Sequence, residues 1–513
     1  MGHLFKGPRD NTKLPKKTLL ICLVLGTFTF SAAIWTVAVE PISVISKYLA
    51  RIDYGTLVHQ ALSRETDSVH ISVYLFNVTN PEEFASGEDH KLRVQEIGPF
   101  TFQENRTNED LEIDREAGVM RYTPRHRVTF LLEESVARPE DVTVTMPNLA
   151  LLSMASAASS YGYFARLGFN LLVERLRSNA TVTMSAQDYL WGYDEPLIRL
   201  GNQFLPGWIN FKTLGLLDRL YDKNTTYRIE INTRDEEKFM IRSINGIGGL
   251  KQWGYPETSS PCNSFTDAYE GLGYPPGMSP DRPLKIYRSI LCRFLDLEYV
   301  GTKPMEYGGK GLEYKVNNRS FSKVLENECL CSKGTCADGV SDLAPCLYGL
   351  PVVMSNAHFL DADPSVYERV EGMNPDEELH GSEFTIEPII GMVLTTKFSV
   401  QLNVLVSDVT FNSDIQRYSH MLVPVAYFKI VQPKLPDDQI TSVRLMHVYG
   451  PYLLIAIQFI FVSSTIFLLS HSLRLIYWNW VFSRRKQVGN KDVLSVKEVL
   501  SSEPLMENCE KIR

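Results

Sequence analysis

The sequence predicts an α+β protein whose main body is held in a membrane by one helix near each end of the chain. Three observations support this prediction. Two long apolar runs near the chain ends contain no charged residue. Short runs rich in β-branched and aromatic residues recur between them, as expected for strands. One segment rich in Ala, Leu and Met instead has the composition and spacing of helices.

The first apolar run extends from Thr18 to Val39. As a helix it spans about 33 Å, enough for a hydrocarbon core of roughly 30 Å. The alternative is a cleaved signal peptide, but the apolar part of a signal peptide is usually only about 7–15 residues long. This run is longer and follows a long basic leader, so we expect an uncleaved anchor.

The second apolar run extends from Val448 to Ser470. Tyr477, Trp478 and Trp480 follow it and are typical of the aromatic belt at a membrane interface. The alternative is a helix buried in a protein core, but its length and the basic residues beyond it favour a membrane span.

Basic residues flank both spans on the side of the chain ends, and the positive-inside rule therefore places both ends in the cytosol. These residues are Lys6, Arg9, Lys13, Lys16, Lys17, Arg474, Arg484, Arg485 and Lys486. An even number of spans requires the same result. The predicted segments are a cytosolic tail (1–17), a helix (18–39), an extracellular or lumenal domain (40–447), a second helix (448–470) and a cytosolic tail (471–513).

Five N-glycosylation sequons support this topology, because all of them fall in the domain predicted to lie outside the cytosol and neither tail contains one. They begin at Asn77, Asn105, Asn179, Asn224 and Asn318.

Six of the eight cysteines lie between residues 262 and 346. They are Cys262, Cys292, Cys329, Cys331, Cys336 and Cys346. On the oxidising side of a membrane an even number of cysteines favours disulfides over a zinc cage, with the connectivity left open by spacing alone. Cys22, near the cytosolic end of the first span, and Cys509 are candidate palmitoylation sites.

Strands are predicted by five runs of the outer domain, and the last two are long enough to pair in antiparallel fashion. The runs are HISVYLFNVTNP (70–81), RHRVTFLL (125–132), TYRIEINT (226–233), EFTIEPIIGMVLTTKFSVQLNVLV (383–406) and MLVPVAYFKI (421–430).

The helical segment extends from 148 to 180. Asn148 follows a proline and is a candidate cap of a first helix, which Gly162 would end. A second helix would then place Phe164, Leu167, Leu171 and Leu172 on one face. Ser185 is a candidate cap of a further short helix.

Motifs for catalysis are absent from the sequence: there is no G-x-S-x-G, H-E-x-x-H, P-loop or G-x-G-x-x-G pattern. Asp376, Glu377, Glu378 and His380 cluster within five positions, which suggests either a calcium or zinc site or a solvated acidic turn. We favour the turn, and a structural rather than catalytic role for His358. The net charge of −8 argues against a nucleic-acid partner. We expect no enzyme, no cofactor and no resident metal.

Several motifs occur in a fixed order along the chain: EIGPFTF (96–102), YLWGY (189–193), the six-cysteine block, GMNPDEELH (372–380) and IEPIIG (386–391). With the two terminal spans, they resemble the class B scavenger receptors over nearly the whole length. That family includes fatty-acid translocase, the high-density-lipoprotein receptor, lysosomal integral membrane protein type 2 and the insect sensory neuron membrane proteins. This chain looks most like an insect-type member.

The resemblance implies a large irregular antiparallel β-barrel with an internal hydrophobic tunnel and a helical apex at 148–180. It implies the disulfides Cys262–Cys329, Cys292–Cys346 and Cys331–Cys336 in a disulfide-rich region, 262–346. It also implies that apolar and basic residues of the apex contact the ligand, here Phe164, Leu167, Leu171, Arg166, Arg175 and Arg177. Arginines late in a helix also complement its dipole, so both interpretations of the basic residues stay open.

We therefore expect a plasma-membrane receptor that binds lipids or lipoproteins and passes fatty acid, sterol or carotenoid through the tunnel to the membrane. Such a device needs no catalytic residue. Exposure of each CH₂ group to water costs about 0.8 kcal/mol, and an apolar conduit removes this cost. The alternatives are a lysosomal or endosomal trafficking receptor that binds a lumenal protein at the apex, and a phagocytic or adhesive surface receptor. The cargo and the oligomeric state stay open.

Overall fold

The computed structural model describes residues 16–500, except 205–208, 210, 222–225, 235, 289–290, 292, 323–337 and 348, and only the backbone over 485–500. The chain forms two compact units. We call Met1–Val44 with Leu445–Arg513 the membrane unit, and Ile45–Arg444 the body.

The membrane unit contains two helices long and apolar enough to cross a bilayer: α1 (Lys16–Ala38) and α12 (Gly450–Leu500), which a π-helical turn at Leu445–Tyr449 precedes. The two helices pack together, and the hydroxyl groups of Thr29 and Thr465 lie 2.8 Å apart. Gly26 permits this approach, since a Cβ atom there would lie 3.2 Å from Leu469 Cδ2. Small residues and interhelical hydrogen bonds are the usual means by which helices associate in lipid. The chain is therefore a membrane protein with two spans, as the sequence predicts.

The body is built on one large and mainly antiparallel sheet, in which fifteen strands of the described residues take part. Its main path runs β7-β6-β3-β2-β1-β17-β16-β15-β11-β10-β9-β8. A single bridge between Met240, next to β7, and Tyr269 of β8 joins the two edges, so the sheet is nearly closed. This agrees with the predicted irregular barrel in an α+β protein.

The strands of the sheet are β1 (Thr66–Val78), β2 (Leu92–Asp114), β3 (Val119–Phe130), β6 (Ile229–Asn232), β7 (Ile241–Ile244), β8 (Ala268–Tyr269), β9 (Leu284–Arg288), β10 (Arg293–Pro304), β11 (Lys310–Val316), β12 (Ser341–Asp342), β13 (Val352–Ser355), β14 (Val370–Glu371), β15 (Glu383–Glu387), β16 (Met392–Leu405) and β17 (Leu422–Val431). A separate hairpin pairs β4 (Thr143–Pro147) with β5 (Thr181–Ser185).

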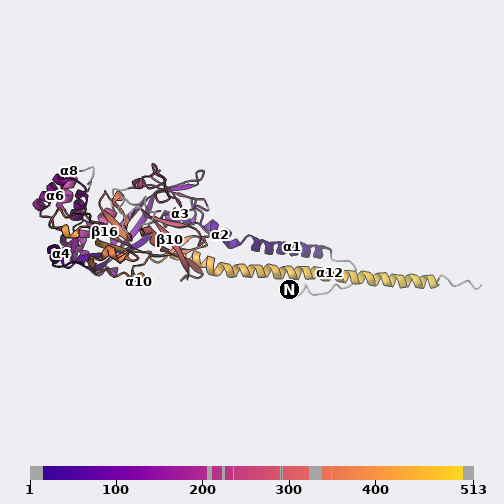
Figure 1. Ribbon diagram of the computed structural model, residues 1–513. Helices are drawn as coiled ribbons and strands as arrows, with labels where there is room; N and C mark the ends of the chain where they lie inside the picture. Colours follow the sequence, from indigo (N-terminus) through magenta and orange to yellow (C-terminus); the bar gives the residue numbers. More distant parts are fainter. Residues whose placement is uncertain are drawn as a thin grey trace, which may run out of the picture. The chain divides into compact units, whose positions relative to one another are not determined.

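The helices between the two spans are α2 (Pro41–Leu49), α3 (Leu57–Leu62), α4 (Pro81–Ser86), α5 (Leu149–Ala158), α6 (Tyr163–Leu176), α7 (Ala186–Trp191), α8 (Pro196–Phe204), α9 (Leu216–Leu220), α10 (Glu377–His380) and α11 (Asp437–Arg444). In the body, α6 and α8 lie at one end of the sheet and α3 lies at the other (Figure 1). We call α5, α6 and α8, which pack against one another, the apex.

The alternation of buried and more exposed residues explains why the central strands form where they do. In β1, Val69, Ile71, Val73 and Leu75 point to the core, and the residues between them are more exposed. β17 lies between β1 and β16 and is buried on both faces from Leu422 to Phe428. Antiparallel pairing of β16 with β17 is confirmed.

The predicted caps at Asn148 and Ser185 are confirmed, but α5 ends at Ala158, before the predicted end at Gly162. The Asn148 side chain accepts a hydrogen bond from Leu151 N at 3.1 Å and caps α5. Gly162 is the N-cap residue of α6 and separates it from α5. Ser185 Oγ accepts from Asp188 N at 3.1 Å and caps α7.

Candidate functional site

The body encloses a cavity of about 760 Å³, within the roughly 300–1,000 Å³ range of ligand pockets. Its wall is mainly apolar and comes from strands of the sheet, from α5 and from the segment around α9. Apolar residues of the wall include Val69, Ile71, Ala150, Met154, Phe211, Leu214, Leu216, Ile286, Leu295, Phe384, Phe398, Leu402, Val404 and Val425. A cavity of this size and composition fits a molecule with long apolar parts.

A polar cluster interrupts the apolar wall at Glu104 on β2. Glu104 accepts hydrogen bonds from His126 Nδ1 at 2.9 Å and from the Tyr221 hydroxyl at 2.6 Å. Burial alone would raise the pKa of Glu104, but these hydrogen bonds, the charge of His126 and the positive charge of Arg288 outweigh it and lower the pKa. The carboxylate is therefore ionised inside the body.

A second buried carboxylate, Glu270, also lines the cavity. The Arg106 guanidinium donates two hydrogen bonds to it, at 2.8 and 3.0 Å, and the Tyr122 hydroxyl donates a third at 2.6 Å. Burial opposes ionisation, but Arg106 and Tyr122 lower the pKa of Glu270 below its usual range. Sequence reasoning missed this cluster. Its signal is the alternation Phe100, Phe102, Glu104 and Arg106, which places two charges on the buried face of β2.

The apex carries a group of exposed apolar side chains, which we call the apolar apex patch: Tyr161, Tyr163, Phe164, Leu167 and Leu171. Phe164 is 85% exposed and Tyr163 is 72% exposed. The three predicted apolar contact residues, Phe164, Leu167 and Leu171, therefore face solvent on α6. A hydrogen bond holds α6 to the main chain at Phe411, since Asn170 Nδ2 donates to Phe411 O at 2.6 Å.

The three predicted basic contact residues differ from one another. Arg166 is bound within the apex: Nε donates to Tyr161 O at 3.0 Å, and the guanidinium lies over the Phe411 ring. Arg175 and Arg177 are exposed at the end of α6, and Arg177 is its C-cap residue. Arg175 and Arg177 alone keep their charge available for a ligand, and their role there stays a prediction.

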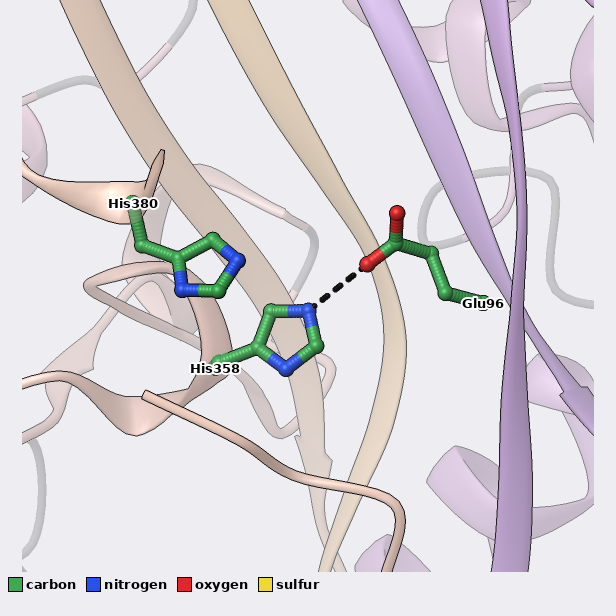
Figure 2. Close-up of side chains that lie close together, drawn as sticks. All are labelled: Glu96, His358 and His380. Carbon is green, nitrogen blue, oxygen red and sulfur yellow. Dashed lines mark hydrogen bonds and ion pairs between the residues drawn. The ribbon is translucent and has the colours of Figure 1, made fainter. Parts of the chain in front are cut away.

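Glu96, His358 and His380 meet in the body, although they are far apart in the sequence (Figure 2). Glu96 comes from β2, His358 from a short 3-10 turn (Ala357–Phe359) and His380 from the end of α10. His358 Nε2 lies 2.8 Å from Glu96 Oε2, and the two imidazole rings stack with centroids 4.1 Å apart. One ligand atom of each residue lies within 4.8 Å of the others, a spacing compatible with a metal ion.

The hydrogen bonds of the two rings argue against a metal at this cluster. His358 Nδ1 accepts from Asn374 N at 3.1 Å, and His380 Nδ1 accepts from Asp376 N at 3.0 Å. Each neutral ring must then carry its proton on Nε2, the nitrogen that would have to bind the ion. A metal-bound histidine instead donates its other N–H to an acceptor. The donor set fits a hydrogen-bonded histidine pair with Glu96 as acceptor for His358.

The acidic residues beside His380 belong to an exposed turn. Asp376 Oδ1 accepts from Leu379 N at 2.9 Å and caps α10, while Glu377 and Glu378 are exposed. This is the solvated acidic turn that the sequence favours. His380 alone points inward.

The predicted modification sites occupy varied positions. Asn179 and Asn318 are exposed, Asn77 and Asn105 are half-buried, and Asn224 lies outside the described residues.

Cys262 and Cys346 are disulfide-bonded. The pairing stays a prediction, because Cys292, Cys329, Cys331 and Cys336 lie outside the described residues. Cys22 is a free thiol buried in the membrane unit, and Cys509 is outside the described residues.

A nearly closed sheet around an apolar cavity, with a helical apex and two terminal membrane helices, defines a two-span membrane protein of the class B scavenger receptor type. The CD36 family profile matches residues 18–476, and the chain belongs to the CD36 family.

Curated relatives agree with this assignment. Lysosome membrane protein 2 of Rattus norvegicus is 27% identical over 455 residues, which cover 86% of this chain and 91% of that protein. Scavenger receptor class B member 1 of Bos taurus is 25% identical over 463 residues, 87% of each chain. Protein peste of Drosophila melanogaster is 26% identical over 347 residues, 64% of this chain and 60% of that protein. The first of these relatives is named as a membrane protein and the second as a receptor.

Proposed function

We propose that this protein is a cell-surface receptor that binds lipids or lipoproteins and transfers apolar cargo through the cavity of its body to the membrane. The observation that carries the proposal is the mainly apolar cavity of about 760 Å³ inside the sheet. Membership of the CD36 family, with scavenger receptors among the relatives, supports it.

The physical reason lies in solvation. Each CH₂ group of a cargo molecule gains about 0.8 kcal/mol when it leaves water for an apolar wall. A fatty acid, sterol or carotenoid can therefore move from a carrier into the cavity without an energy source. Movement on to a bilayer costs little, because both environments are apolar.

Filling the cavity tests this function. Ser153 is buried on α5 and lines the cavity, so Ser153→Phe would place a ring in the space that cargo needs. Ser160 follows α5 and is exposed, so Ser160→Phe is the matched control. We expect Ser153→Phe to lower lipid uptake into cells at equal surface expression, and Ser160→Phe to leave uptake unchanged. Equal uptake by both variants would overturn the proposal.

A trafficking receptor is the second candidate, and the apolar apex patch favours it. Exposed aromatic side chains on a rigid helix are typical of protein-binding surfaces. Lysosome membrane protein 2 is also among the relatives. Microscopy of the protein tagged at its tail separates the two candidates: a plasma-membrane pattern supports the cell-surface receptor, and a lysosomal pattern supports the trafficking receptor.

A further inference from the structure

One charged residue in the wall of the cavity has no partner among the described residues. The other Arg, His and Glu side chains of the wall are all paired. The pairs are Glu104 with His126, Glu270 with Arg106, Arg125 with Glu109, and Arg219 with Asp218. Arg288 makes no ion pair and no side-chain hydrogen bond with any residue that the structure describes.

Arg288 is the last residue of β9, and its main chain lies opposite Arg293 in the antiparallel register with β10. Strand pairing therefore fixes the position of its backbone. Its Nη2 atom lies beside Gly271, which also lines the cavity, and would be 3.7 Å from a Cβ at that position. The absence of a side chain at Gly271 leaves room at the guanidinium.

The neighbouring carboxylates do not need the donors of Arg288. Glu104 and Glu270 sense its positive charge, but their hydrogen bonds come from His126, Tyr221, Arg106 and Tyr122. Arg288 therefore contributes a charged fork of N–H donors to the cavity wall, and no described residue supplies an acceptor for it. Arg288 is half-buried in the cavity wall, and a carboxylate delivered by the cargo would accept charge-assisted hydrogen bonds from its unused donors.

We infer that Arg288 is a specificity-determining residue of the cavity, which binds the ionised carboxylate of an amphipathic lipid whose chain lies along the apolar wall. This inference rests on the proposed function. A planar guanidinium donates two parallel hydrogen bonds to a carboxylate, and it remains charged at every physiological pH. The charge of Glu104 opposes a bound anion, so a neutral lipid with a hydroxyl group is the competing cargo.

The test compares two lipids with the same chain, palmitate and hexadecanol, on the full-length protein in detergent. Their affinities are measured for the wild type, Arg288→Met, Arg288→Lys and the control Arg138→Met, which removes a paired and exposed arginine that does not line the cavity. We expect Arg288→Met to weaken palmitate binding roughly 10- to 100-fold, as for the loss of a charge-assisted hydrogen bond, and to leave hexadecanol binding unchanged. Arg288→Lys should fall between Arg288→Met and the wild type, and Arg138→Met should match the wild type.

The possible failures can be told apart. If the wild type binds hexadecanol as tightly as palmitate, or if Arg288→Met binds palmitate like the wild type, the inference is wrong and the proposed function stands. If the wild type binds neither lipid, and no cholesterol in a parallel assay, both fail. Loss of hexadecanol binding by Arg288→Met would show that this variant does not fold. Arg288→Lys then decides. If it prefers palmitate over hexadecanol as strongly as the wild type does, the planar fork has no role and the inference is wrong.

Discussion

His358 and His380 stack face to face, with ring centroids 4.1 Å apart and an angle of 17° between the rings (Figure 2). Main-chain N–H groups of Asn374 and Asp376 donate to their Nδ1 atoms. Protonation of either ring would place a second hydrogen against one of these N–H groups. The hydrogen bond from Asp376 N to Nδ1 therefore favours the neutral form of His380.

This arrangement predicts a loss of stability in acid. Burial, and then the charge of His358, lower the pKa of His380 to about 4 from its usual 6.5, although Glu96 and Asp376 act in the opposite direction. The folded state then binds fewer protons than the unfolded state between pH 6.5 and about 4. The contribution of His380 is thus present above pH 6.5 and is lost as the pH falls toward 4.

The measurement is the thermal unfolding of wild type and His380→Gln at pH 7.4 and pH 4.5. The acid-induced loss should be roughly 1–2 kcal/mol smaller in the variant, allowing for partial solvation of the ring. His90→Gln, which changes an exposed histidine, should behave like the wild type. Identical acid sensitivity of His380→Gln and wild type would show that the pair does not respond to pH in this range.

Zinc should not stabilise the protein through Glu96, His358 and His380, because the Nε2 atoms carry the ring protons. We expect the melting temperature to stay the same with and without added zinc at pH 7.4. The contrary result is a rise in melting temperature that disappears in His358→Gln. Such a rise would mean that the main-chain hydrogen bonds at Nδ1 break when the ion binds.

The buried pair Arg106–Glu270 should contribute strongly to the stability of the body. Arg106→Met leaves Glu270 buried without its partner, and such losses cost about 3–5 kcal/mol. Arg125→Met, which breaks an exposed pair, should cost at most about 1 kcal/mol. Chemical denaturation compares the two. The double variant Arg106→Met, Glu270→Met should recover part of the loss, and no recovery would mean that packing rather than charge dominates.

The apolar apex patch should affect recognition and not folding. Because Phe164 is 85% exposed, Phe164→Asp should change the free energy of unfolding by less than about 0.5 kcal/mol. We expect it to weaken binding of a protein or lipoprotein ligand, measured on intact cells, and to leave transfer of free lipid unchanged. Normal ligand binding by this variant would exclude the patch as a docking surface.

The elements that could be predicted from the sequence are those fixed by local patterns. Asn148 and Ser185 act as caps within one turn of helix, and the alternation of β1 is visible in its own residues. The apolar spans were predictable because lipid permits no other composition. β2 was missed because its charged residues suggest a surface loop, whereas Glu104 and Arg106 are buried.

The cavity and the histidine pair could not be predicted, because they depend on contacts between distant residues. A leucine such as Leu402 has the same periodicity whether it faces a packed core or a cavity. Glu96 and His358 are 262 positions apart, and no local pattern links them. The proposed role of Arg288 could likewise not be predicted, because it depends on how the other charged residues of the cavity wall are paired.

The most direct test of the central claim is to measure lipid retained by the protein after detergent exchange, using mass spectrometry of the full-length wild type and Ser153→Phe. The account predicts that the wild type retains lipid in defined stoichiometry and that Ser153→Phe, with its cavity filled, retains far less. Equal lipid content in the two proteins, or none in the wild type, would contradict it.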